Sequence, residues 1–150
     1  MKIRNNDLII LYLLCVVSVI GFLTNDLCSD EINECMQQQT LSEKKTIYFI
    51  LIIHHFIAAF LFFGWLFNNK KILLIYIFTP IIIVLHWSLN EWNCKLSQLI
   101  NKKCNLDDSR LFPDFIDFIG LRKENIWLYA IRQFYLITVF FVSIYKYKYL

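Results

Sequence analysis

Ionisable side chains occur inside stretches of the sequence that are otherwise apolar. An ionisable group in a membrane-embedded helix is costly to bury unless it is paired or hydrated, so it marks a polar site. Such groups could hydrogen-bond to one another as a structural layer or line a pocket for a small molecule or lipid headgroup. Histidines on facing helices could also bind a metal ion or haem. The residues concerned are His54, His55, His86 and Arg132.

The depths of these four side chains in their helices match. Depth is counted from the end of each helix that faces the long loops, with a rise of 1.5 Å per residue. His54 and His55 then lie about 10–12 Å deep, and His86 and Arg132 about 6–9 Å deep. We therefore expect one polar cluster, with Arg132 paired to Glu91. Its predicted members are His54, His55, His86, Asn90, Glu91 and Arg132. A metal or haem site would use His54, His55 and His86, although adjacent histidines point about 100° apart on a helix.

Cysteines are the second set of residues that could do chemistry. Cys15 lies in an apolar run, where a thiol behaves as a small apolar side chain. The other four lie in two polar segments, with one pair in each segment: Cys28 and Cys35, then Cys94 and Cys104. If both segments face an oxidising compartment, two structural disulfides are expected, and the sequence leaves three connectivities open.

The same cysteine layout resembles small four-span disulfide oxidases, which carry a cysteine pair in each extracytoplasmic loop and pass electrons to a quinone. That resemblance implies a redox role for Cys28, Cys35, Cys94 and Cys104. The chain has no C-x-x-C motif, which in such enzymes keeps a disulfide exchangeable. Structural disulfides are therefore favoured over redox catalysis, with free thiols and a metal site as further alternatives.

Four long apolar runs must position these residues. They cover about 8–23, 47–67, 72–89 and 126–145, and each is close to the 20 or so residues that a helix needs to cross a bilayer. The sequence therefore predicts an all-α integral membrane protein, a single four-helix bundle over residues 1–150. The first run could instead be a signal peptide, but the small-residue cleavage pattern is poor, which favours an uncleaved span.

Basic residues in the short segments predict the orientation. Lys2 and Arg4 precede the first run, Lys70 and Lys71 lie between the second and third, and the C-terminal tail is also basic. By the positive-inside rule both termini should be cytoplasmic, which leaves loops 24–46 and 90–125 non-cytoplasmic. Aromatic residues would mark the cytoplasmic interface: Trp65, Tyr145, Tyr147 and Tyr149.

The second loop and the overall composition add two further expectations. Residues 111–119 have apolar side chains at helical spacing and are followed by Gly120, which predicts a short helix that lies on the membrane surface or caps the bundle. The chain is 58% apolar and only 18% charged with a net charge of +3, which excludes an ordinary soluble domain and a nucleic-acid partner.

The stretch from His54 to Leu99 resembles uncharacterised small multi-span membrane proteins of bacteria and large DNA viruses. The resemblance depends on the order of a few polar, glycine and aromatic positions: His54 or His55, Gly64, Trp65, His86, Trp87, Asn90 and Cys94. It implies a four-span fold and no particular activity.

The sequence thus favours a non-catalytic structural or interaction component of a cellular or viral membrane. Its partners would be the lipid bilayer and other membrane proteins, and no cofactor is expected. The alternatives are a thiol-disulfide oxidoreductase that uses a quinone and a membrane protein that binds haem or metal.

Overall fold

The structure is a computed structural model, which describes residues 5–90, 94–106 and 126–150, without the side chains of 126–130 and 132. Within these ranges the chain is helical and contains no strand. The four long helices are α1 (Asn5–Gly21), α3 (Leu41–Phe63), α4 (Lys70–Leu89) and α7 (Ile126–Tyr149). Two short helices, α2 (Asp30–Gln38) and α5 (Lys95–Cys104), lie between them along the chain.

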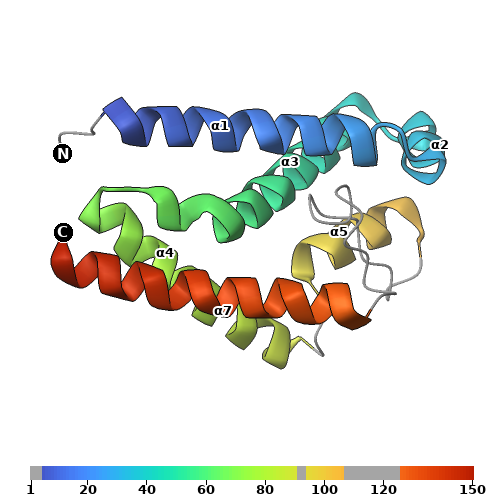
Figure 1. The fold of residues 1–150 in the computed structure, drawn as a ribbon. Coiled ribbons are helices and arrows are strands. Elements are labelled where there is room, and N and C mark those ends of the chain that lie inside the picture. The colour runs from blue at the N-terminus through green and yellow to red at the C-terminus, as the bar shows by residue number, and fades with distance from the viewer. Residues whose placement is uncertain (1–4, 91–93, 107–125) are drawn as a thin grey trace.

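The long helices run lengthwise through the molecule (Figure 1). α1 packs against α3, and α4 packs against α7, while α3 also contacts α4 and α7. The start of α1, the turn between α3 and α4 and the end of α7 lie at one end, and α2 and α5 lie at the other. We call these the terminal end and the head.

Three of the long helices are confirmed as long and apolar enough to cross a membrane. They are Asn5–Asp26, which includes a π-helical turn η1 (Phe22–Asp26), then Leu41–Leu66, which includes a 3-10 turn η2 (Gly64–Leu66), and Lys70–Leu89. The predicted fourth run, 126–145, lies within α7. Its membrane crossing stays a prediction, and the predicted helix over 111–119 lies outside the described residues.

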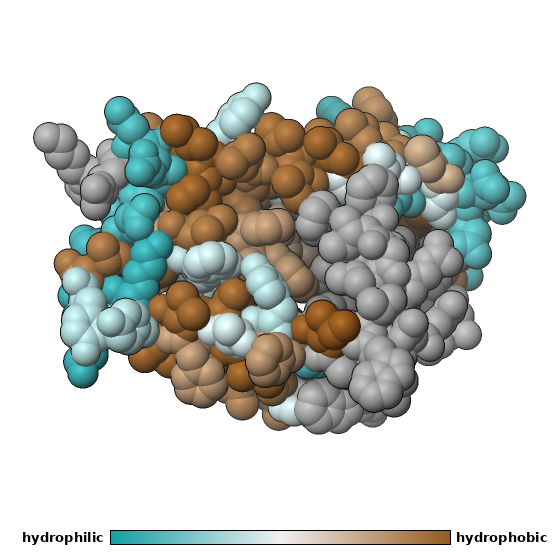
Figure 2. All heavy atoms as spheres, viewed as in Figure 1, coloured by the Kyte–Doolittle hydropathy of each residue, from teal (hydrophilic) through white to brown (hydrophobic). Residues whose placement is uncertain are grey.

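Apolar side chains cover the outside of the long helices. Only 11% of the apolar stretch of α4 is buried within the protein, and large side chains such as Ile75 and Ile82 are exposed along it. Figure 2 shows apolar residues over the middle of the molecule and hydrophilic residues at both ends. A water-soluble helix would turn its apolar stripe inward, so this surface suits a lipid environment.

Several helix boundaries differ from those predicted, and two of them lie at the head. α3 begins at Leu41 because Thr40 and Glu43 form a capping box, in which each side chain bonds to the other's backbone N–H. The first helix continues to Asp26 through η1, whereas the sequence predicts its end at about residue 23. The segment predicted as loop 24–46 therefore contains the end of one long helix, the whole of α2 and the start of α3.

The head has its own apolar core, which connects it to α3. Residues from η1, α2, α3 and α5 pack together there: Phe22, Ile32, Cys35, Met36, Ile47, Leu51 and Ile100. α5 lies inside the predicted loop 90–125, so this loop is partly helical. The head is thus a folded cap at one end of the long helices.

Candidate functional site

The most deeply buried polar contact described in the protein joins the first helix to α3. The imidazole Nε2 of His55 lies 2.9 Å from a carboxylate oxygen of Asp26. Their side chains are 0% and 1% exposed. Asp26 is therefore a member of this site, although the sequence predicts it to lie in the loop 24–46.

The π-helical turn η1 places Asp26 within reach of His55. The hydrogen bonds of a π-helical turn span five residues instead of the four of an α-helix, and such turns are frequent at functional sites. Asp26 is the last residue of this turn, and Phe22 at its start packs into the head core. The turn thus directs an apolar residue into the head core and a carboxylate toward α3.

Gly21 allows α1 to approach the imidazole closely. A Cβ atom at this position would lie 2.9 Å from Nδ1 of His55, closer than real Cβ contacts allow. The absence of a side chain therefore lets the α1 backbone lie against the face of His55. Small residues at helix contacts in membranes commonly serve this purpose.

An Asp–His pair can orient a histidine as a general base, provided that the second ring nitrogen reaches a substrate. Here that nitrogen is Nδ1, which is buried against Gly21 and has no hydrogen-bond partner among the described residues. The Oδ1 oxygen of Asp26 is also buried and has no hydrogen-bond partner among the described residues. The geometry suits a structural contact between two helices better than it suits catalysis.

The other predicted members of the polar cluster have different partners. His86 on α4 is exposed, and its Nε2 accepts a hydrogen bond of 3.3 Å from the backbone N–H of Lys95. The side-chain amide of Asn90 donates to Gln98 at 3.0 Å. These two bonds connect the end of α4 to α5, so the predicted cluster is divided between two places.

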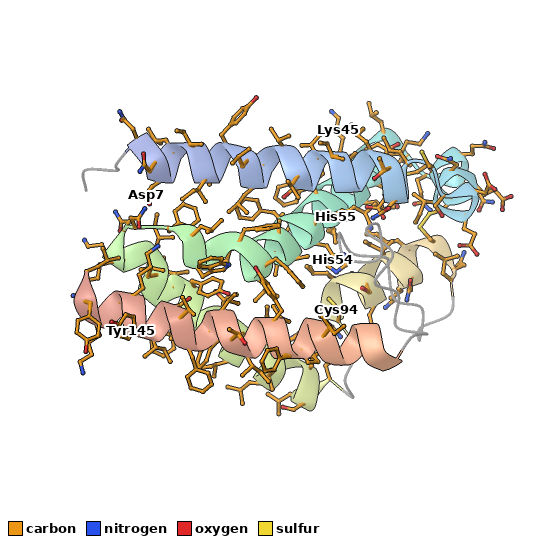
Figure 3. All side chains as sticks on the ribbon, viewed as in Figure 1. Asp7, Lys45, His54, His55, Cys94 and Tyr145 are labelled. Atoms are coloured by element: carbon orange, nitrogen blue, oxygen red, sulfur yellow. A yellow bond between two sulfur atoms is a disulfide. The ribbon has the colours of Figure 1, made fainter. Side chains whose placement is uncertain are left out.

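His54 lies beside His55, with ring centroids 5.9 Å apart, and Figure 3 shows it on the side of α3 toward α5. Glu91 and the side chain of Arg132 lie outside the described residues. Within the described ranges, no group of three or more His, Cys, Asp or Glu side chains is placed to hold a metal ion.

One disulfide, between Cys35 and Cys104, connects α2 to α5 across 69 residues of sequence. It lies in the head core, where Cys35 is 6% exposed. The expectation of two disulfides is wrong for this structure, since Cys28 and Cys94 are free thiols. The bond joins the two cysteine-containing segments, whereas the oxidase resemblance implies a pair within each segment.

Exchange with an external thiol requires access to the sulfur atoms, and labile disulfides are commonly exposed ones. Cys35 is buried and Cys104 is only partly exposed, which favours a structural role for this bond over redox catalysis. Gln39 strengthens the same contact, because its amide donates a hydrogen bond of 3.0 Å to the backbone carbonyl of Lys103.

No family model, curated protein or solved structure matches this chain. The resemblance over His54–Leu99 thus stays a prediction. The site has to be interpreted from its own geometry.

The Asp26–His55 pair is tested by Asp26→Leu, His55→Leu and the double variant. Each single variant leaves one buried polar partner unpaired, so we expect a loss of about 3 kcal/mol in the free energy of unfolding. The double variant should lose less than the sum of the singles. Asp30→Leu, an exposed carboxylate four residues further along, should change stability by less than about 1 kcal/mol. Additive single losses in detergent unfolding would show that the two side chains do not interact.

The disulfide is tested by peptide mapping under non-reducing conditions. We expect one cross-linked peptide pair that contains Cys35 and Cys104, together with alkylated Cys28 and Cys94. Closing a loop of 69 residues should stabilise the protein by about 4 kcal/mol in the chain-entropy account, so Cys35→Ser/Cys104→Ser should unfold at a clearly lower temperature. A Cys28–Cys35 or Cys94–Cys104 link would contradict this pairing.

Proposed function

We propose that this chain is a non-catalytic, four-span integral membrane protein that acts as a structural or interaction component of its membrane. The observation that carries the proposal is the apolar surface of the long helices, of which α4 is only 11% buried. A helix of this length and composition that is left uncovered by protein requires lipid around it. The fourth span would be α7.

The polar groups of the bundle support a structural role, because their hydrogen bonds are internal. Asp26 and His55 face one another between two helices. At the terminal end, Asp7 is buried and accepts a hydrogen bond of 2.6 Å from the backbone N–H of Asn68. Each of these pairings satisfies one polar atom of a side chain that would otherwise be costly to bury in a membrane.

The arrangement of the two ends supports the proposed orientation. The start of α1, the α3–α4 turn and the end of α7 lie together (Figure 1), as expected for four crossings with both termini on one side. The cysteine-containing head lies at the opposite end, which would be the non-cytoplasmic side, where a disulfide persists. The first helix would remain in the mature protein, because Leu14 packs with Ala59 of α3 and Gly21 lies against His55.

The orientation is tested with the free, exposed thiol of Cys28. In a Cys15→Ala/Cys94→Ser background, a membrane-impermeant maleimide should label Cys28 in intact cells. In the same background with Cys28→Ser and Lys71→Cys, labelling should require permeabilised membranes, because Lys71 lies at the cytoplasmic terminal end.

Two outcomes would contradict the proposal. Labelling of Lys71→Cys but not of Cys28 in intact cells would invert the orientation. Release of the protein from membranes by alkaline carbonate would exclude an integral membrane protein altogether.

A further inference from the structure

The terminal end carries a group of lysines and tyrosines, which we call the lysine–tyrosine belt: Lys70, Lys71, Lys146, Tyr147, Lys148 and Tyr149. It comes from two segments that are far apart in the sequence, the start of α4 and the end of α7. The ammonium of Lys70 lies 5.1 Å from the centre of the Tyr147 ring, and that of Lys148 lies 5.5 Å from the Tyr149 ring. The first of these contacts joins the two segments.

Lys146 is the structural member of the belt. Its ammonium donates hydrogen bonds to the backbone carbonyls of Trp65 at 3.2 Å and Leu66 at 3.0 Å. Lysine commonly bonds in this way to the last carbonyls of a helix. Lys146 therefore fixes the end of α7 beside the α3–α4 turn.

The other three lysines, Lys70, Lys71 and Lys148, are exposed. The neighbouring stretches 60–75 and 126–150 contain no Asp or Glu. The acidic side chain described at this end is Asp7, which is 1% exposed and accepts a hydrogen bond from the backbone of Asn68. Among the described residues, none of these three ammonium groups forms a salt bridge, so together they present a positive surface.

We propose that the lysine–tyrosine belt binds the phosphate groups of anionic phospholipids in the leaflet that faces the termini. The inference rests on the proposed function, since it requires that the apolar helices be in a bilayer. The belt lies where those helices end and where Figure 2 shows hydrophilic residues replacing apolar ones. Tyrosine rings at that level lie among the headgroups, and lysines there attract anionic lipid.

The test uses the full chain in nanodiscs of phosphatidylcholine alone or mixed with phosphatidylglycerol. Native mass spectrometry then measures the ratio of the two lipids that remain bound after the disc is removed. We expect phosphatidylglycerol to be enriched on the wild-type protein. Each lysine near the surface favours anionic lipid by about five-fold, so Lys70→Gln/Lys71→Gln/Lys148→Gln should remove most of that enrichment.

The matched control is Lys44→Gln/Lys45→Gln/Lys102→Gln, which removes the same charge from the head. It should keep the enrichment. Both triple variants should melt within about 4 °C of the wild type in phosphatidylcholine, because none of these lysines is buried and the exposed contact of Lys70 with Tyr147 contributes at most about 1 kcal/mol. If both triple variants lose the same amount of phosphatidylglycerol enrichment, or if neither loses any, the proposal is overturned.

Two further measurements separate the possible causes of failure. If inorganic phosphate in detergent stabilises the wild type as much as phosphatidylglycerol does, and the belt variant loses both effects, then the belt is a free-phosphate site and the lipid assignment is overturned. If carbonate releases the protein from membranes, the proposed function has failed. If the protein stays inserted but shows no enrichment, only the belt proposal has failed.

Discussion

The burial of Asp26 and His55 between the first helix and α3 is the interaction on which the rest of the arrangement depends. In lipid, apolar surface gives little drive for helices to associate, so close packing and polar bonds between helices have to hold them together. Here one hydrogen bond of 2.9 Å and the close approach of Gly21 provide both. Leu14 and Ala59 extend the same interface as an apolar contact.

The other elements follow from that interface through a continuous set of contacts. η1 holds Asp26 in place, and at its other end it inserts Phe22 into the head core. The disulfide holds α2 on α5, and α5 is bonded in turn to the end of α4 through His86 and Asn90. At the opposite end Asp7 and Lys146 bring α1 and α7 to the α3–α4 turn. Hydrogen bonds from polar side chains or backbone groups near its ends thus join each long helix to a neighbouring element.

The sequence predicts the long helices well, because hydropathy and length are local properties of a chain. The capping box of Thr40 and Glu43, which begins α3, is a further local signal in the sequence. The pairing of Asp26 with His55 could not be predicted in this way, since it spans 29 residues and depends on a π-helical turn that no residue pattern specifies. The similar depths of His55 and His86 in their helices predict that they lie in one cluster. Depth does not give the direction in which a side chain points around its helix.

Disulfide connectivity was undetermined for a similar reason. Four cysteines in two segments allow three pairings, and the choice depends on how α2 and α5 pack around Ile32 and Ile100. That packing is a tertiary property. The free cysteines follow from the same geometry, since Cys28 lies before α2 and Cys94 at the start of α5, away from the helix faces that form the core.

The most direct test of this account is the state of His55 in a bilayer. Nitrogen-15 NMR of histidine-labelled protein in lipid should show one imidazole whose N–H exchanges slowly with solvent, and the signal should disappear in His55→Gln. The account predicts that Asp26→Asn shifts this signal and leaves those of His54 and His86 in place. A His55 signal that exchanges as fast as the other two, or that does not change in Asp26→Asn, would contradict the buried pair.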